Sequence, residues 1–251
     1  MKSRPRKPAR PSPRRKTSSS KAPRKTPQKA PRAAAHRAGH TLVVSAWEPE
    51  VAPLRSLIAA RGEELAGHVT LMAVGVGVVD AAAGAAAAIA RLTPDEIVFV
   101  GTAGVYPSAA PAHAIGEAAV AGELRLVSTA ALRGDAYTPA PLVASAVSTP
   151  ALAARLRAGL GAEPSPLALV ACPLAITQTE ELAARLGATG AALENLEAFA
   201  VARAAAAAGV PFAAVLGVSN QVGPRAHSQW RANHLAASRA ACHVVWRALK
   251  S

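Results

Sequence analysis

The chain contains 251 residues, which suits one α/β domain and a tail, and its sequence pI is about 11.0. The basic charge is concentrated in residues 1–40, which hold fourteen Lys and Arg and no Asp or Glu, so the other residues hold 14 basic and 15 acidic side chains. The net charge of +13 therefore belongs to the tail, which excludes a charge-based argument for nucleic-acid binding by the folded body.

Residues 1–40 contain no Leu, Ile, Val, Phe, Trp or Tyr. Such a segment cannot bury enough apolar surface to offset the entropy of ordering, so we expect it to be disordered. It also lacks the central apolar run of a secretory signal. Three interpretations stay open: a basic arm that contacts nucleic acid or anionic lipid, a solubilising appendage, or upstream sequence translated from a wrongly chosen start codon. The last two are favoured, because no aromatic residue is interleaved to stack on bases.

Residues 41–251 alternate between extended and helical patterns. We expect strands at 41–46, 68–74, 97–100, 117–120, 124–129, 167–172 and 212–218, and helices at 51–61, 79–92, 139–161, 179–186, 196–208 and 233–249. The segments 117–120 and 124–129 are expected to pair, and Thr177 or Thr179 to cap the next helix. Continuous apolar strands alternating with helices predict an α/β fold, a three-layer αβα sandwich around a central, mainly parallel mixed sheet.

The two cysteines, Cys172 and Cys242, lie far apart and outside any Cys-x-x-Cys or Cys/His cluster. Two reduced thiols and the lack of an export signal predict a cytoplasmic protein. No apolar stretch resembles a membrane span, because Gly, Arg and Asp interrupt the alanine runs.

The stretch from Glu194 to Trp230 carries the strongest functional signal. Glu197 opens an alanine-rich helix, and Ser219 with Asn220 ends the buried strand that follows. Ligands of open α/β sheets bind outside the carboxyl ends of the strands, so an acid and an amide placed in this way can face one pocket. The ordinary alternatives are that acids are favoured in the first turn of any helix and that Asn is a common turn residue.

These residues resemble the purine nucleoside phosphorylase and nucleosidase superfamily, and within it most closely the futalosine hydrolases. The resemblance rests on Glu194-Asn195-Leu196-Glu197, Ser219-Asn220, Pro224-Arg225 and Trp230. Residues 45–51 are similar to the first strand-to-helix turn of the nucleosidases, and residues 75–82 and 100–104 to the next two sheet segments. The resemblance covers about residues 41–249.

The resemblance implies an enzyme that hydrolyses the N-ribosidic bond of a purine nucleoside with three catalytic residues. Glu50 would activate the attacking water as a general base. Glu197 would hold the ribose hydroxyls and stabilise the positive charge that develops on the sugar. Asn220 would contact the purine, with Ser219 orienting its loop. Glu48, two residues before Glu50, is interpreted as an ordinary acid of a first helical turn.

Further substrate-binding residues are implied in the same way: Thr102, Ala103, Gly104, Asn195, Leu196 and Arg225. Arg225 would pair with the carboxylate of futalosine, and Arg133 is the competing candidate. Glu194 is the alternative ribose acid if the register slips. The resemblance implies neither a metal ion nor an organic cofactor, and it implies a homo-oligomer.

Three positions depart from the family pattern. Adenine-specific members carry Asp where this chain has Asn220, whose N–H can donate to a 6-keto oxygen or to N7. The amide at position 220 favours a 6-oxopurine such as hypoxanthine, and with it the futalosine route to menaquinone. The change from Asp to Asn leaves open which group protonates the leaving purine. Leu196 replaces a Met of similar volume, a change that cores tolerate. Leu216 replaces an Arg, and the residues alone do not explain that loss.

Other functions fit these residues less well. The acidic turn Glu48-Pro49-Glu50 favours hydrolysis over phosphorolysis, because acids repel phosphate. The runner-up is a 5′-methylthioadenosine or S-adenosylhomocysteine nucleosidase. Rivals from other classes are a non-catalytic nucleoside-binding module and a dinucleotide-binding protein, since Gly75-Val76-Gly77 follows a strand and opens a helix. Against the latter, Asp80 stands where a third glycine is needed.

Overall fold

The computed structural model describes residues 39–161 and 166–250. In chain order the elements are β1 (His40–Ser45), α1 (Glu48–Arg61), a 3₁₀ turn (Gly62–Glu64), β2 (His68–Ala73), α2 (Val78–Leu92), β3 (Glu96–Val105), β4 (Ala118–Val127), α3 (Thr129–Arg133), β5 (Ser145–Val147), α4 (Pro150–Ala158), β6 (Ala168–Pro173), α5 (Glu180–Gly187), β7 (Leu193–Glu194), α6 (Ala198–Ala208), β8 (Phe212–Gln221) and α7 (Ala226–Leu249). Residues 1–38 of the predicted disordered tail lie outside the described residues. His40, which the prediction placed in the tail, is the first residue of β1.

Within the described part of the chain, eight strands form one mixed sheet in the order β2-β1-β3-β7-β6-β4-β5, and β8 pairs with both β3 and β4. The pairs β1–β2, β1–β3, β3–β8, β4–β6 and β6–β7 are parallel. The pairs β3–β7, β4–β5 and β4–β8 are antiparallel. The predicted mainly parallel, mixed sheet is therefore confirmed. Because β1, β3 and β8 run in one direction, their carboxyl ends meet at the same edge.

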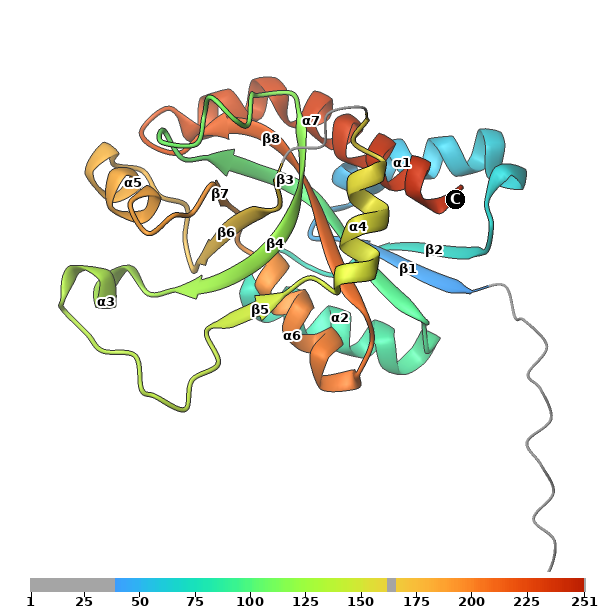
Figure 1. Ribbon diagram of the computed structural model, residues 1–251, viewed down its shortest axis with the longest axis horizontal. Helices are drawn as coiled ribbons and strands as arrows, with labels where there is room; N and C mark the ends of the chain where they lie inside the picture. The colour runs from blue at the N-terminus through green and yellow to red at the C-terminus, as the bar shows by residue number, and fades with distance from the viewer. Residues whose placement is uncertain (1–38, 162–165, 251) are drawn as a thin grey trace, which may run out of the picture. The chain divides into compact units, whose positions relative to one another are not determined.

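Helices cover both faces of the sheet, as Figure 1 shows, with α1, α4 and α7 on one side and α2 and α6 on the other. Successive strand residues point to opposite faces. Val43 and Val98 accordingly belong to the core under α1, α4 and α7, whereas Leu42 and Phe99 belong to the core under α2 and α6. Burial on both faces explains why these strands read as continuous apolar runs.

Three predictions about the elements were wrong. The segments 117–120 and 124–129 are one strand, β4, because a register shift between Ala121 and Glu123 carries the strand through Gly122 instead of breaking it. The region 139–161 is not mostly helical: it contains β5, which pairs with β4, and only nine helical residues in α4. The last helix begins at Ala226 instead of residue 233, because its polar first turns gave no apolar periodicity.

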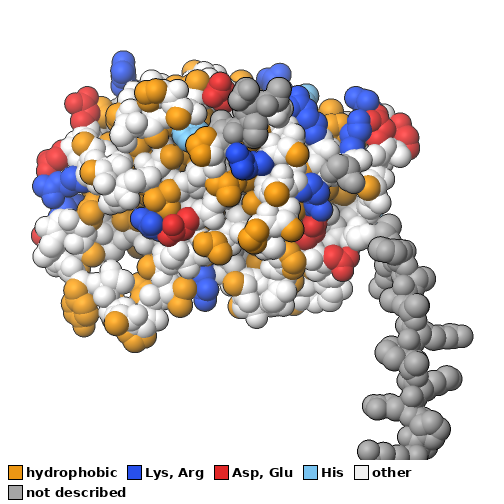
Figure 2. All heavy atoms as spheres, viewed as in Figure 1, with side chains coloured by type: hydrophobic (Ala, Val, Ile, Leu, Met, Phe, Trp, Pro, Cys, Tyr) orange, Lys and Arg blue, Asp and Glu red, His pale blue; other side chains and the backbone are white. Residues whose placement is uncertain are grey.

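The surface of the described residues has mixed charge. Figure 2 shows acidic and basic side chains interspersed over one face. No helix in the described ranges is both long enough and apolar enough to span a bilayer.

Candidate active site

A cavity of about 380 Å³ lies at the carboxyl ends of β1, β3 and β8. Nine of the ten site residues predicted from the sequence line it, namely Glu50, Thr102, Ala103, Gly104, Asn195, Leu196, Glu197, Ser219 and Asn220. Arg225 is not among the lining residues, although Ala226 and His227 beside it are. The structure thus gathers these side chains from segments as much as 170 residues apart, and their individual roles stay predictions.

Glu50 is buried in the first turn of α1. Its Oε1 accepts hydrogen bonds from the backbone N–H and the hydroxyl of Thr102, both at 2.8 Å. Burial raises the pKa of Glu50 to about 7, the negative charge of Glu197 adds to this, and the hydrogen bonds from Thr102 oppose it. A carboxyl group with such a pKa can exchange a proton near neutral pH, as a general base for water must.

Thr102 is engaged by the protein more than the sequence suggested. We expected Thr102 to bind the substrate; its hydroxyl donates to Glu50 and accepts from the indole Nε1 of Trp230 at 3.2 Å. Because an indole N–H can only donate, the Thr102 proton is directed to Glu50. A chain of two hydrogen bonds therefore joins α7 to the buried acid.

Glu197 lies at the N-cap of α6 and is also buried. Its Oε1 accepts the backbone N–H of Gly77 at 2.9 Å, and burial raises its pKa. Gly77 has φ of 86°, a conformation that favours glycine. The turn from Gly75 to Gly77, which we had weighed as a dinucleotide motif, thus presents its amide to a carboxylate.

Asn195 positions Glu197. Its Oδ1 accepts the backbone N–H groups of Glu197 and Ala198 at 3.0 and 2.8 Å, as a helix-capping side chain does. Its Nδ2 donates to the Thr102 carbonyl at 3.0 Å, which ties the start of α6 to β3.

Glu194 lines the same cavity, but its oxygens accept from protein groups. Oε2 accepts from the hydroxyls of Tyr106 and Thr177, at 2.7 and 2.6 Å, and Oε1 from the Thr177 backbone N–H at 3.0 Å. These bonds anchor the loop before α5, whose N-cap is Thr179. These contacts favour Glu197 over Glu194 as the ribose ligand, and that role stays a prediction.

Asn220 presents an N–H group. The hydroxyl of Ser219 lies 2.7 Å from Oδ1, and Nδ2 donates to the Gln221 carbonyl at 3.2 Å. A carbonyl can only accept, so the amide orientation is fixed and the second Nδ2 proton is left for a ligand. Gly104 makes room for this amide, because a Cβ there would lie 2.8 Å from Asn220 Nδ2.

Aromatic rings form the remaining wall, and the sequence analysis missed most of it. Trp47 and Trp230 have ring centroids 6.1 Å apart, and His227 and His234 both stack on Trp230, at 5.9 and 4.6 Å. Trp47, His227 and Trp230 line the cavity. The position of Trp47 directly before the acidic turn was the available signal, whereas the polar sequence around His227 gave none.

Two departures from the family pattern have different surroundings. Leu216 is fully buried in β8 and packs in the core under α2 and α6. At this position the chain therefore has apolar packing, where the resemblance described above implies an Arg. Leu196 lines the cavity, partly buried.

Arg133, the competing candidate for a substrate carboxylate, pairs with Asp135 and is not among the residues that line the cavity.

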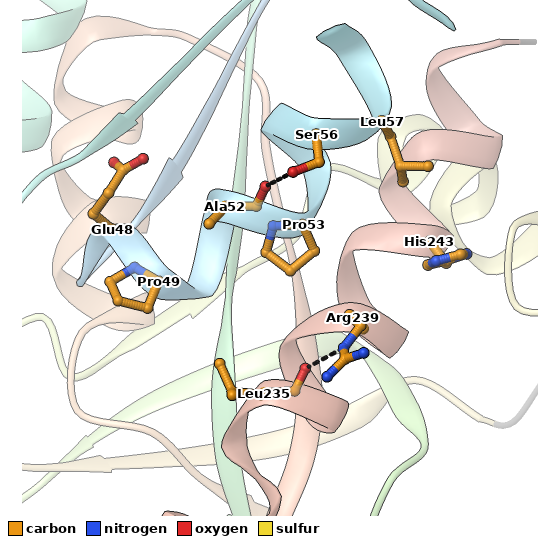
Figure 3. A pocket seen from close by; sticks show the side chains of 9 residues that line it. All are labelled: Glu48, Pro49, Ala52, Pro53, Ser56, Leu57, Leu235, Arg239 and His243. Carbon is orange, nitrogen blue, oxygen red and sulfur yellow. Dashed lines mark hydrogen bonds between the residues drawn. The ribbon is translucent and has the colours of Figure 1, made fainter. Parts of the chain in front are cut away.

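A second concave surface lies between α1 and α7 (Figure 3). It is a groove of about 620 Å³ whose lining includes Glu48, Leu235 and His243. Two of its polar groups bond to their own helices: Ser56 donates to the Ala52 carbonyl and Arg239 to that of Leu235, each at 3.2 Å.

In residues 39–161 and 166–250, no cluster of three or more His, Cys, Asp or Glu could hold a metal ion.

Comparison with known proteins identifies the family of the chain. The family model described as the phosphorylase superfamily matches residues 32–250. Futalosine hydrolase of Streptomyces coelicolor is 34% identical over 169 residues, which are 64% of this chain and 71% of that protein.

Solved structures share the fold. The 5′-methylthioadenosine/S-adenosylhomocysteine nucleosidase of Neisseria meningitidis, in complex with methylthio-immucillin-A, has a TM-score of 0.73 at 20% identity, over 84% of this chain and 99% of that one. Native futalosine hydrolase of Helicobacter pylori strain 26695 has a TM-score of 0.73 at 14% identity, over 85% and 98%.

Proposed function

The chain belongs to the phosphorylase superfamily, and from that premise we propose that it hydrolyses futalosine to hypoxanthine and the free sugar derivative. The coarser activity is that of a nucleoside N-ribosidic bond hydrolase. The observation that carries the proposal is the convergence of two buried carboxylates, Glu50 and Glu197, with the Asn220 amide in one cavity.

Hydrolysis fits the cavity better than phosphorolysis does. A phosphate dianion needs cations and free N–H donors, whereas the partners of Glu50 are the amide and hydroxyl of Thr102. Three acids line the cavity, and among the lining residues His227 alone has a basic side chain. A carboxylate that titrates near pH 7 can take a proton from water, and its negative charge would repel phosphate.

The reaction can be written with the residues in place. Glu50 accepts a proton from a water whose oxygen bonds to C1′, while the bond from C1′ to purine N9 breaks. Glu197 accepts hydrogen bonds from the ribose hydroxyls and stabilises the positive charge on the ring. The leaving purine takes its proton at N7 from solvent or from a group that the cavity does not identify. Water is consumed, and hypoxanthine and a reducing sugar are formed.

The base preference follows from the orientation of Asn220. Its Oδ1 lies 2.7 Å from the Ser219 hydroxyl, one Nδ2 proton is donated to Gln221, and the residue lines the cavity, so we assign the second Nδ2 proton to the base. A 6-keto oxygen can accept that hydrogen bond. A 6-amino group would instead place its own N–H donor against the N–H donor of Asn220. The 34% identity to a futalosine hydrolase supports the same substrate.

Free-base release tests the proposal. Futalosine, inosine, 5′-methylthioadenosine and S-adenosylhomocysteine are each incubated with the protein, with and without phosphate, and the bases are separated by chromatography. We expect hypoxanthine from futalosine at a rate that does not depend on phosphate. Adenine release with no hypoxanthine would overturn the proposal in favour of the adenosine-type nucleosidase.

A further inference from the structure

We infer that Trp230 is a positioning residue for the proposed base Glu50: its indole N–H orients the Thr102 hydroxyl, which in turn stabilises the ionised form of the Glu50 carboxyl group. The inference rests on the proposed function, because it extends the role given there to Glu50. The proposed reaction gives Trp230 no role of its own.

Chemistry fixes the direction of both hydrogen bonds that join Trp230 to Glu50. The indole Nε1 of Trp230 lies 3.2 Å from the Thr102 Oγ1, which lies 2.8 Å from the Glu50 Oε1. An indole N–H can only donate and a carboxylate can only accept, so the Thr102 proton points to Glu50. Without the indole, this hydroxyl is free to turn its proton to water in the cavity. Trp230 therefore selects the orientation in which Thr102 donates to the acid.

The same arrangement strengthens the bond between Thr102 and Glu50. A hydroxyl that accepts one hydrogen bond donates the next one more strongly, by about 10–30% per bond. The acceptor here is a carboxylate, and hydrogen bonds to charged groups are about twice as strong as those between neutral groups. The gain applies to the ionised carboxylate, which is the form that can take a proton from water.

Glu50 depends on hydrogen-bond donors because its surroundings oppose its charge. Burial raises its pKa, and the negative charge of Glu197 on α6 adds to this. Cys242 on α7 donates its thiol to the Glu50 carbonyl at 3.2 Å and stays neutral, since burial raises the pKa of that thiol to about 12. The hydrogen bonds from Thr102 lower the pKa of Glu50, and Trp230 stabilises one of them.

Neighbouring titratable groups on α1 and α7 have contacts of their own. On α1, Glu48 is about half exposed and pairs with Arg55. On α7, the rings of His227 and His234 stack on Trp230, with centroids 5.9 and 4.6 Å away. Trp230→Phe keeps an aromatic ring for both histidines and removes the N–H donor, so it isolates the hydrogen bond.

The titration of Glu50 tests the inference without any turnover. Glutamate carboxyl carbons are labelled with carbon-13 and followed by NMR between about pH 5 and pH 9, and Glu50→Gln assigns the Glu50 signal. In Trp230→Phe we expect the midpoint to lie about half a pH unit higher, because the ionised form is less stabilised. Thr102→Val, which removes the hydroxyl, should raise the midpoint by about one pH unit. Adding Trp230→Phe to Thr102→Val should raise it no further.

Trp47→Phe is the matched control. Trp47 lines the same cavity with its ring 6.1 Å from that of Trp230, but the bond to the Thr102 hydroxyl comes from Trp230. A smaller ring admits water, which lowers the pKa of a buried acid, so Trp47→Phe should leave the Glu50 midpoint in place or lower it. The same result in Trp230→Phe would overturn the inference, and so would additive shifts in the double variant.

Activity provides the second measurement. The acid limb of kcat for hypoxanthine release should move to higher pH in Trp230→Phe by the same amount as the NMR midpoint. If the midpoint rises but the unmodified protein releases no hypoxanthine, the proposed function fails and the positioning of Glu50 stands. If hypoxanthine is released and the midpoint does not rise, the inference fails and the proposed function stands.

Discussion

Two concave surfaces of the described residues share α1 and α7, and the hydrogen bonds of their polar groups differ. In the larger groove, Ser56 and Arg239 bond to carbonyls one turn away on their own helices. In the smaller cavity, Gly77 bonds to Glu197 across 120 residues and Thr102 to Glu50 across 52. The volume of a hollow therefore does not identify the site; the convergence of buried polar groups from distant segments does.

Two acids on α1 show the same difference within one helical turn. Glu48 is about half exposed and pairs with Arg55 at 2.8 Å, which is a surface ion pair of little energetic consequence. Glu50 is buried beneath the cavity, and burial raises its pKa to about 7. The two side chains are chemically alike. Substituting each in turn therefore shows whether activity depends on the cavity or on the groove.

The largest effect is expected for Glu50→Gln. Removal of a general base should lower kcat by about 10²–10⁴. Glu48→Gln, the matched control, should stay within about twofold of the unmodified protein. The measurement is steady-state hypoxanthine release from futalosine. Equal effects of the two changes would contradict the assignment of the base to the cavity.

Glu197→Gln should lower kcat by about 10²–10³, since the neutral amide no longer stabilises charge on the sugar. The Gly77 amide can still donate to the new side-chain oxygen, so the fold should persist, which a melting curve checks. Activity close to that of the unmodified protein would remove Glu197 from the proposed mechanism.

The pH dependence of kcat should follow Glu50. A general base must be ionised to act, so activity falls as pH drops through the pKa of about 7, approaching tenfold per pH unit below it. Initial rates from pH 5.5 to 8.5 measure this acid limb. A profile that stays flat down to pH 5.5 would contradict the role of this carboxyl group.

Asn220→Asp should change specificity more than stability. The acid can accept from a 6-amino group, so we expect the ratio of adenosine-type to inosine-type cleavage to rise about tenfold. Competition between the two nucleoside types in one tube measures the ratio directly. If the ratio does not change, Asn220 does not read the base.

The smallest expected effect is on stability. The folded pKa of Glu50 lies above its usual value, so ionisation costs stability as pH rises from about 4.5 to about 7 and the cost is complete above that range. Glu50→Gln should therefore raise Tm by several degrees at pH 8 and by almost nothing at pH 4. Thermal melts at both pH values check this, and an equal change at both would contradict it.

The sequence predicted most strands and helices because the apolar runs of β1, β3 and β8 are buried on both sheet faces. The predicted bounds of strands and helices were wrong where the local residue pattern and the tertiary packing favour different structures. Gly122 looked like a break, yet the sheet accommodates it through a register shift. The start of α7 looked like a loop, because its polar residues face the cavity and solvent.

The candidate site was predictable to a similar degree. Glu50, Glu197 and Asn220 were predicted from the family resemblance, and their places at strand ends and helix starts explain why one cavity can contain all three. The hydrogen bond from Gly77 to Glu197 and the ring contacts of Trp47 and His227 depend on backbone placement between distant segments. No residue pattern encodes such contacts, and the structure was needed to find them.

Isotope transfer measures whether the smaller cavity adds water to a nucleoside. Futalosine is incubated with the protein in oxygen-18 water that also contains phosphate, and the sugar product is analysed by mass spectrometry after a short reaction. We expect a free sugar derivative that carries the heavy oxygen at C1 and no phosphate, and the same product in smaller amount from Glu50→Gln. A sugar 1-phosphate would contradict it.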